Sequence, residues 1–355
     1  MSHSVSDSNR SPAAPRPPLP GPLGRLAERA YLAALARRNQ RFDAGAGVLH
    51  LPIPVISVGN LTVGGTGKTP MVQRIAQWLL DANLRPAIAM RGYRSTPDHP
   101  SDEHSEHLAC FAGALPIIAQ PDRAAGLRPL IASGAIDCAV LDDGFQHRQL
   151  ARDLDAVLID ATQPLHAARC LPAGWLREPP SALARAHAVV LTRTSDAPPE
   201  ALDALRSAVS AHAGSPPIAE CAHAWDSLDS ADAHRPIEWL ASRRVIVACA
   251  VGNPGAFVRA AQRAGALVEA TLLRRDHHAW NNADRRALER LTNNSLPVLT
   301  TMKDWVKWRR LNLGPLEHLF VRPRLTLQFS HGEDALRSRV LATARATPTP
   351  RAGVH

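Results

Sequence analysis

The chain has 355 residues, of which 45% are hydrophobic and 21% are charged, and its formal net charge is +9 at pH 7. This length allows one large domain or two ordinary ones, and the apolar fraction excludes a chain that is disordered throughout. The basic excess is compatible with three kinds of partner: nucleic acid, an anionic membrane surface or phosphorylated substrates. Arginine supplies nearly all of the positive charge, since only three of the 41 basic residues are lysines: Lys68, Lys303 and Lys307.

Cysteine spacing and apolar run lengths indicate the cellular compartment. The five cysteines are widely separated and form no CxxC pair, which argues against a disulfide framework or a structural zinc site and fits a reducing environment. No run approaches the ~18–20 uninterrupted apolar residues of a membrane-spanning helix. The N-terminus is polar and proline-rich, unlike a secretory signal. These features predict a cytoplasmic protein.

The N-terminal region divides into a tail and a helix. Residues 1–22 are rich in Ser and Pro and are predicted to be disordered. Residues 23–45 are predicted to form a basic amphipathic helix, because small or apolar side chains recur at helical spacing and arginines lie largely on other faces. The apolar set is Leu23, Leu26, Ala27, Ala30, Tyr31 and Ala34. Such a helix either packs against the domain or lies in the headgroup layer of an anionic membrane.

Residues 46–215 alternate between apolar runs and helical stretches. This pattern predicts a parallel sheet covered by helices on both faces. The expected strands are 55–58, 87–90, 116–119, 135–141, 156–159 and 188–191, and the expected helices include 71–83 and 123–133.

A second alternation follows and predicts a smaller α/β unit over residues 216–341. Its expected strands are 245–251, 267–272, 297–300 and 319–321, with a helix over 256–264. Residues 195–236, rich in Ala, Ser, His and Pro, are interpreted as a connector, and residues 342–355 as a disordered tail. The predicted fold class is therefore α/β, with a P-loop NTPase-like α/β/α domain followed by a second, smaller α/β/α domain.

The strongest local signal is a glycine-rich loop between an apolar strand and a helix. Glycines let backbone N–H groups point at phosphate oxygens, and the helix N-terminus adds its dipole. The residues predicted to bind ATP are Thr62, Val63, Gly64, Gly65, Thr66, Gly67, Lys68 and Thr69. Within this loop the Lys68 ammonium would reach the β- and γ-phosphates, and the Thr69 hydroxyl would ligate Mg²⁺. The loop has Thr62 where the standard pattern has Gly, and Val63 where ATPases that switch by dimerising carry a second lysine.

A second carboxylate-bearing strand end is expected beside this loop. The apolar run 136–141 ends in Asp142 and Asp143, and ligands of α/β sheets bind at the carboxyl ends of the strands. One of the two carboxylates would hold Mg²⁺ and the other would orient the site. An ordinary Asp-Asp-Gly turn is the alternative for this segment taken alone.

With these motifs in this order, the chain resembles the tetraacyldisaccharide 4'-kinases of lipid A biosynthesis. The resemblance runs from about residue 55 to residue 304. Besides the loop it rests on Val58-Gly59-Asn60, Arg91-Gly92-Tyr93, Asp102-Glu103, Asp122-Arg123, Asp142-Asp143-Gly144-Phe145-Gln146-His147, Leu171-Pro172-Ala173-Gly174, Leu176-Arg177-Glu178-Pro179, Asp276-His277-His278 and Lys303-Asp304.

The resemblance implies an enzyme that transfers the ATP γ-phosphate to the 4'-hydroxyl of an acylated glucosamine disaccharide 1-phosphate, in a cleft between two α/β/α domains. It implies peripheral attachment to the cytoplasmic face of the inner membrane. By resemblance, Asp102 is the base that takes the hydroxyl proton and His277 is its partner, which agrees with the need to activate a weak nucleophile. Arg123, Arg177 and Glu178 match family residues that line the cleft. Position 101 is Ser where the family usually has Gly, and Lys303 and Asp304 match a motif without a derived role.

Two other functions are compatible with parts of the sequence. A switch ATPase or GTPase acting through protein partners would be expected to dimerise with nucleotide or to carry an Asn-Lys-x-Asp base-reading motif, and Lys303 is followed directly by Asp304. A nucleic-acid-binding protein is suggested only by the basic charge, because no nucleic-acid module is recognisable. We therefore expect ATP, Mg²⁺, the lipid acceptor and an anionic membrane surface as partners, and no nucleic acid.

Overall fold

The computed structural model describes residues 17–64, 66–92, 102–163, 165, 168–276, 278–293 and 295–346, apart from the side chain of Asp102. Within these residues the strands are β1 (Val55–Asn60), β2 (Pro86–Met90), β3 (Ile117–Ala119), β4 (Cys138–Asp142), β5 (Leu154–Asp160), β6 (Ala188–Thr192), β7 (Ala219–Asp229), β8 (His234–Pro236), β9 (Arg244–Cys249), β10 (Leu267–Leu273), β11 (Val298–Leu299) and β12 (Phe320–His331).

The helices lie between these strands in the α/β order that the sequence predicts. The α-helices are α1 (Gly21–Asp43), α2 (Lys68–Asp81), α3 (Asp102–Phe111), α4 (Arg123–Ala132), α5 (Pro199–Ala213), α6 (Pro254–Arg263), α7 (Asn282–Thr292), α8 (Met302–Trp308) and α9 (Glu333–Arg345). Short 3₁₀ helices are η1 (Pro180–Arg185), η2 (Thr194–Asp196), η3 (Ile237–Leu240) and η4 (Gly314–Leu319).

All the strands belong to one sheet in the order β10-β9-β11-β12-β7-β6-β5-β1-β4-β2-β3, with β8 paired to β7. Strands β1 to β6, with α2 to α5, form what we call the P-loop unit. Their pairings are parallel, and β1, β4 and β5 are buried along their whole length, as expected for a sheet covered on both faces. The register pairs Val58 of β1 with Asp142 of β4, so the glycine-rich loop and the acidic turn leave the sheet side by side.

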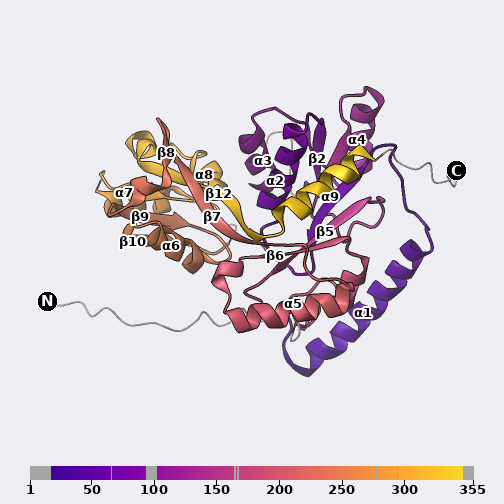
Figure 1. Cartoon of the computed structure of the whole chain (residues 1–355). Coiled ribbons are helices and arrows are strands. Elements are labelled where there is room, and N and C mark those ends of the chain that lie inside the picture. Colours follow the sequence, from indigo (N-terminus) through magenta and orange to yellow (C-terminus); the bar gives the residue numbers. More distant parts are fainter. Residues whose placement is uncertain are drawn as a thin grey trace.

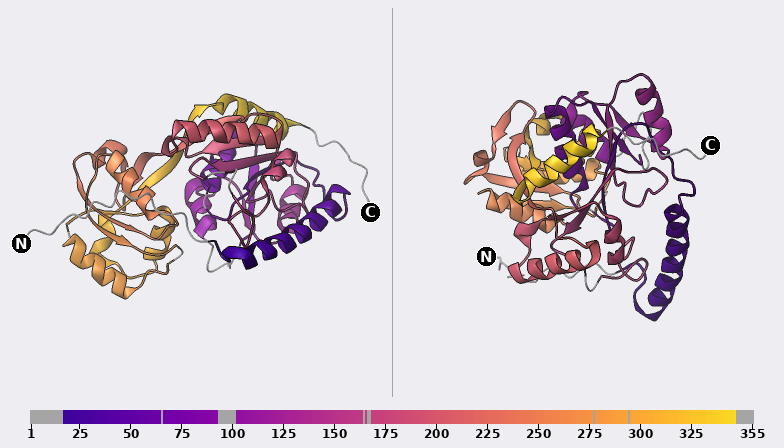
Figure 2. Two further views of the ribbon diagram at one scale, coloured as in Figure 1. Left: turned by 90° about the horizontal axis from the view of Figure 1, so that it is seen from below. Right: turned by 45° about the vertical axis from the view of Figure 1, so that its right-hand side comes forward.

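The C-terminal unit, as we call β9 to β11 with α6 to α8, continues the same sheet. Its strands are parallel to one another and to the start of β12. The link between the two units is an antiparallel pair, β7 with β12, which has eleven and twelve residues in its two strands. Both figures show this long pair running between the two bodies (Figures 1 and 2). The fold class predicted from the sequence is confirmed, with an antiparallel connection that the sequence patterns did not predict.

Separate apolar cores hold the helices on the two faces of the sheet. On one face α2 and α9 share a core with β1, β4 to β7 and β12, through buried residues such as Met71, Ile75, Leu336 and Val340. On the other face α5 and η1 pack on β5 and β6, and α4 packs on β1, β2 and β4. The C-terminal unit has its own cores, one of which includes Trp305 and Trp308.

Three segments differ from the sequence-based expectations. Residues 195–236, predicted as a connector, contain η2, α5, β7 and β8, because their few large apolar side chains, such as Leu205 and Val209, are buried in the P-loop unit. The predicted tail from residue 342 begins inside α9, which ends at Arg345 and returns the chain to the P-loop unit. Helix α1 begins at Gly21 and ends at Asp43 rather than spanning 23–45.

Helix α1 lies along the outside of the P-loop unit, as both figures show (Figures 1 and 2). Its buried residues are Gly24, Glu28 and Leu35, so one side of the helix is docked. Near its start, Leu23 and Leu26 are 72% and 64% exposed, so this end of the helix presents apolar side chains to solvent. Among the described residues, no helix is both long enough and apolar enough to cross a membrane.

Candidate active site at the phosphate loop

The glycine-rich loop leaves β1 and enters α2 at Lys68. Gly67 is the residue before the helix and has φ of +85°, a left-handed conformation that favours glycine. The loop is fixed from two sides: Thr192 Oγ1 donates to the Thr66 carbonyl at 3.0 Å, and the Val63 N–H donates to the Trp175 carbonyl at 2.8 Å. The loop therefore rests between the end of β6 and the segment that carries the Leu-Pro-Ala-Gly motif. Gly65 lies outside the described residues.

Lys68 and Asp143 face each other at the mouth of the loop. The Lys68 ammonium lies 3.6 Å from Asp143 Oδ1 and donates to Asn60 Oδ1 at 3.3 Å. Arg177 Nη1 also donates to both Asp143 oxygens, at 2.9 and 2.7 Å. Burial raises the pKa of Asp143, but the nearby Lys68 and Arg177 outweigh it, and the pKa lies below its usual value. The carboxylate is therefore held ionised next to the predicted phosphate site.

Asp143 reaches this position through a strained backbone. Its φ of +55° is uncommon for a residue other than glycine and is kept only where the surroundings enforce it. The turn that follows packs closely on β1: a Cβ on Gly59 would lie 2.4 Å from Phe145 Cβ. Gln146 Nε2 donates to the Asn60 carbonyl at 2.9 Å. The acidic turn and the end of β1 are thus one packed unit, which explains why position 59 is a glycine.

Asp142 and Arg123 lie beneath this turn. Arg123 is 3% exposed and Asp142 is 4% exposed. Arg123 Nη2 donates to the carbonyls of Asp142 and Asp143, both at 3.3 Å. Burial lowers the pKa of Arg123, while the two aspartates act in the opposite direction. The carboxylate of Asp142 accepts a hydrogen bond from His107 Nε2 of α3 at 3.0 Å, a partner that the sequence motifs did not indicate.

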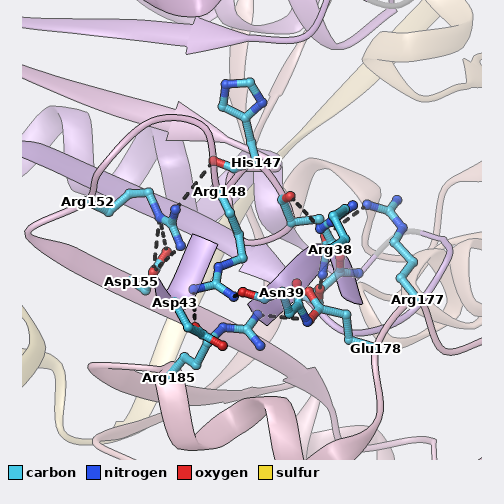
Figure 3. A network of polar contacts seen from close by, with 12 residues as sticks. Arg38, Asn39, Asp43, His147, Arg148, Arg152, Asp155, Arg177, Glu178 and Arg185 are labelled. Atoms are coloured by element: carbon cyan, nitrogen blue, oxygen red, sulfur yellow. Dashed lines mark hydrogen bonds and ion pairs between the residues drawn. The ribbon is translucent and has the colours of Figure 1, made fainter. Parts of the chain in front are cut away.

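Glu178 is fully buried rather than open to a cleft. Its Oε2 accepts from Arg185 at 2.9 Å and from Asn39 of α1 at 3.3 Å, as Figure 3 shows. In this position its carboxylate holds Arg185 and Asn39 in place. Arg177, the preceding residue, is partly exposed and points at Asp143. The family resemblance implies that both residues line the cleft, and the structure shows that Glu178 is buried while Arg177 is partly exposed.

Helix α1 takes part in this network. Arg38 Nη2 donates to the Gln146 carbonyl at 3.0 Å, and Tyr31 OH donates to the Arg177 carbonyl at 2.6 Å. Arg148 of the acidic-turn segment reaches back to Asp43 at 2.6 Å (Figure 3). The N-terminal helix is therefore packed on the domain through residues that hold the acidic turn and Arg177. Its packed side agrees with the first of the two interpretations of this helix, and its exposed apolar end leaves the second open.

The two residues predicted for acceptor activation are at the edge of what the structure describes. Asp102 is the first residue of α3, and its side chain is not described. His277 lies outside the described residues. Its neighbours are placed in the C-terminal unit: Asp276 Oδ1 accepts from Lys303 at 3.0 Å, and His278 Nε2 lies 2.8 Å from Asp284 Oδ2.

The structure explains the aspartate of the Lys303-Asp304 motif by its hydrogen bonds. Asp304 is fully buried and accepts from Trp280 Nε1 and the Ala250 N–H, both at 3.0 Å. Thr301 Oγ1 also donates to it at 2.8 Å. Asp304 therefore ties the start of α8 to the end of β9, and it supports the loop that leads to Asp276 through the neighbouring Lys303.

His223 of β7 is another side chain that the sequence motifs missed. A Cβ on Gly67 would lie 2.3 Å from His223 Nε2, so the ring sits directly against the loop. Burial, with a further contribution from Arg193, lowers the pKa of His223 to about 4. The ring is therefore neutral at pH 7. No local pattern marks this residue, because its contact depends on the course of β7 between the two units.

A pH-dependent stability is expected from His147. Burial, together with Arg123 and Arg152, lowers the pKa of this side chain from 6.5 to about 4. Between these values the unfolded chain binds a proton that the folded chain does not, so stability falls as the pH drops from about 6.5 to about 4. The unmodified chain should lose unfolding free energy between pH 7 and pH 5, and we expect this loss to be about 1–2 kcal/mol smaller in His147→Gln. Urea denaturation at pH 7 and pH 5 measures the unfolding free energy of each protein.

The exposed His234, paired with Asp229 at the surface, provides the control. His234→Gln should leave the difference between the two pH values as in the unmodified chain. An equal acid-induced loss in the unmodified chain and in His147→Gln would contradict the assignment.

Comparison with known proteins identifies the family of this chain. The family model described as tetraacyldisaccharide-1-P 4'-kinase matches residues 22–345. A tetraacyldisaccharide 4'-kinase from Anaeromyxobacter sp. (strain K) is 35% identical over 360 aligned residues, which cover 94% of this chain and 95% of that protein. One from Azotobacter vinelandii is 32% identical, covering 91% of this chain and 94% of that protein.

A solved structure is similar to this chain in both fold and sequence. The crystal structure of LpxK from Aquifex aeolicus in complex with ATP superposes with a TM-score of 0.67 at 28% identity, covering 89% of this chain and 96% of that chain. The match spans the P-loop unit and the C-terminal unit together, and it does not favour the alternative of a switch ATPase or GTPase. The chain belongs to the tetraacyldisaccharide-1-P 4'-kinase family.

Proposed function

We propose that this chain transfers the γ-phosphate of ATP to the 4'-hydroxyl of a tetraacyldisaccharide 1-phosphate, a lipid A precursor. The observation that carries the proposal is the convergence of Lys68 and Arg177 on Asp143 at the mouth of the loop, in a chain that matches the family over residues 22–345. Two cations and an acid at a helix N-terminus suit a transferring phosphoryl group, whose charge must be neutralised in place.

The loop residues named from the sequence, Thr62 to Thr69, are the proposed ATP-binding residues. The N–H groups at the start of α2 would face the phosphates, with the helix dipole adding to their attraction. Lys68, now 3.6 Å from Asp143, would exchange part of this ion pair for the β- and γ-phosphates. Arg123 and Arg177, both within reach of the acidic turn, would neutralise the charge on the transferring oxygens, and Glu178 would hold the surrounding network in place.

Mg²⁺ fits the donors at this point. The proposed donors are the Thr69 hydroxyl and the carboxylates of Asp142 and Asp143, which are hard oxygen ligands. The described residues hold no group of three or more His, Cys, Asp and Glu side chains arranged around a metal, and Mg²⁺ in nucleotide sites uses one or two carboxylates with substrate phosphates and water. When bound, the ion would shield the negative charge of the phosphates.

The acceptor would be activated by Asp102. In the proposed step, its carboxylate takes the proton of the 4'-hydroxyl, the hydroxyl oxygen bonds to the γ-phosphorus, and the bond from that phosphorus to the β,γ-bridging oxygen breaks to release ADP. His277, carried by the C-terminal unit, would orient Asp102. We also propose that the P-loop unit and the C-terminal unit act as two domains with the acceptor between them.

The direct test is a transfer assay. Purified protein in detergent is incubated with γ-labelled ATP, Mg²⁺ and the tetraacyldisaccharide 1-phosphate, and we expect a labelled bisphosphorylated lipid. Asp102→Asn should abolish the labelled lipid while ATP binding persists, because the substitution removes only the base. Absence of labelled lipid with folded, ATP-binding protein would refute the proposed function.

We propose that the exposed start of α1 attaches the enzyme to the cytoplasmic face of the inner membrane as a peripheral protein. Leu23 and Leu26 are exposed beside Arg25 and Arg29, a combination that suits an anionic bilayer surface. The double variant Leu23→Ser/Leu26→Ser is expected to weaken binding to vesicles of anionic phospholipid by more than about tenfold, since each buried leucine contributes about 1.5–3 kcal/mol. Vesicle sedimentation measures the change.

A leucine exposed elsewhere controls for general surface polarity. Leu267 at the start of β10 is 55% exposed, and Leu267→Ser should sediment with vesicles as the unmodified protein does. Equal vesicle binding by the α1 double variant and the unmodified protein would show that α1 serves only to pack on the domain.

A further inference from the structure

A buried histidine joins the helix of the proposed base to the acidic turn. His107 lies on α3 and is 0% exposed, and Asp142, the last residue of β4, is 4% exposed. His107 Nε2 lies 3.0 Å from Asp142 Oδ2. Because a carboxylate only accepts, Nε2 carries the proton and donates it. The pair therefore connects α3 with the strand end beside the loop.

This hydrogen bond accounts for the direction of the Asp142 carboxylate. Within the described part of the chain, Arg123 donates to the backbone carbonyl of Asp142, and His107 is the side chain that bonds its carboxylate. Asp143 has a left-handed backbone and turns to Lys68 and Arg177 instead. The two adjacent carboxylates thus have separate partners: one is held from the loop side and the other from α3.

The place of His107 along α3 gives the contact a second consequence. It lies five residues after Asp102, the first residue of the helix, so the bond that holds Asp142 also fixes the opening turns of α3 against β4. The other ring nitrogen, His107 Nδ1, is buried and has no hydrogen-bond partner among the described residues. Within that part of the chain, the hydrogen bond to Asp142 therefore orients the ring. A buried hydrogen bond of this kind fixes geometry because no water replaces it.

We infer that His107 is a positioning residue for phosphoryl transfer, which sets the Asp142 carboxylate and the start of α3 in a fixed relation at the nucleotide site. The inference rests on the proposed function. Groups that orient a ligating carboxylate typically change metal affinity or activity by about 10- to 100-fold when removed. The effect should fall on kcat and on the response to Mg²⁺, and much less on the affinity for ATP alone, because the loop and Lys68 are untouched.

The test compares His107→Leu with His107→Gln. Leu fills part of the ring volume without a donor, whereas the Gln amide can donate to Asp142. We expect His107→Leu to lower kcat by about 10- to 100-fold, while its affinity for ATP in the absence of Mg²⁺ changes by less than about threefold. His107→Gln should restore most of the loss in kcat. Independently of turnover, the gain in affinity for a fluorescent ATP analogue on adding Mg²⁺ should be lost in His107→Leu and kept in His107→Gln.

His234→Leu is the matched control, because it removes an exposed histidine from its pair with Asp229. It should behave as the unmodified enzyme in both measurements. If His107→Leu does not fold, His107→Asn, whose amide is too short to reach Asp142, takes its place. A folded donor-free variant with unchanged kcat and an unchanged Mg²⁺ response overturns the inference, as does a His107→Gln variant as impaired as His107→Leu. An unmodified protein that transfers no phosphate would refute the proposed function, and the nucleotide-binding measurement would still test His107.

Discussion

Lys68→Ala is expected to reduce kcat/KM for ATP by about 100- to 1,000-fold, the range found when one preorganised donor to a developing charge is removed. Lys68 is the one lysine at the phosphate loop and lies 3.6 Å from Asp143. Without it, the phosphates lose the ammonium that would approach their β- and γ-oxygens. Steady-state kinetics with the lipid acceptor measure the loss. Thermal unfolding should change little, because Asp143 keeps its ion pair with Arg177.

Arg85→Ala is the control for the loss of one positive charge. Arg85 is exposed and pairs with Asp137 at 2.6 Å, before the start of β2 and away from the carboxyl ends of the strands. Its substitution should leave kcat/KM within about twofold, since exposed ion pairs contribute little. If Lys68→Ala kept activity within tenfold of the unmodified enzyme, the phosphate-binding role of this lysine would have to be abandoned.

Gly67→Ala is expected to weaken ATP binding by at least about tenfold. The new Cβ would lie 2.3 Å from His223 Nε2, at a residue whose φ is +85°. The left-handed backbone costs alanine about 1–2 kcal/mol, and overpacking adds about 1–3 kcal/mol, so the loop is expected to move from its present position. Titration with a fluorescent ATP analogue measures the affinity, and 1.4 kcal/mol corresponds to a factor of ten.

Two further variants separate the contact from the backbone cost. Gly214 follows α5, has φ of +74° and would place a Cβ in open space, so Gly214→Ala should lower stability slightly and leave ATP affinity unchanged. Adding His223→Ala to Gly67→Ala removes the colliding ring and should recover part of the affinity. Equal affinity in the single and double variants would show that His223 does not restrict the loop.

The sequence predicted the fold where local patterns were strong. Apolar runs bounded by turns located β1, β2, β4, β5 and β6, and these strands are buried along their length. Residues 195–236 do not form the connector that their composition predicts. Their α5 and β7 contain many small and polar residues. Helix α5 is stabilised by packing on β5 and β6, and β7 by pairing with β12. Pairing between distant strands is not encoded in any short window of sequence.

The same division holds for the site. The motifs identified Lys68, Asp142 and Asp143, because phosphate chemistry limits which residues can follow a glycine-rich loop and end a buried strand. Arg123 and Arg177 came from the family resemblance. The motifs gave no sign that Glu178 is fully buried, since the adjacent Arg177 is partly exposed and a sequence does not show which of two neighbours faces inward.

The amino-acid sequence by itself determined the fold class, the phosphate loop, the acidic strand end and the family to which the chain belongs. Only the tertiary structure decided which partner each charged group has: Lys68 and Arg177 for Asp143, His107 for Asp142, and His223 against Gly67. The physical reason is the separation along the chain between the residues that interact. Loops and strand ends are set by residues next to one another in the chain, whereas these contacts join elements brought together by packing of the sheet and its helices.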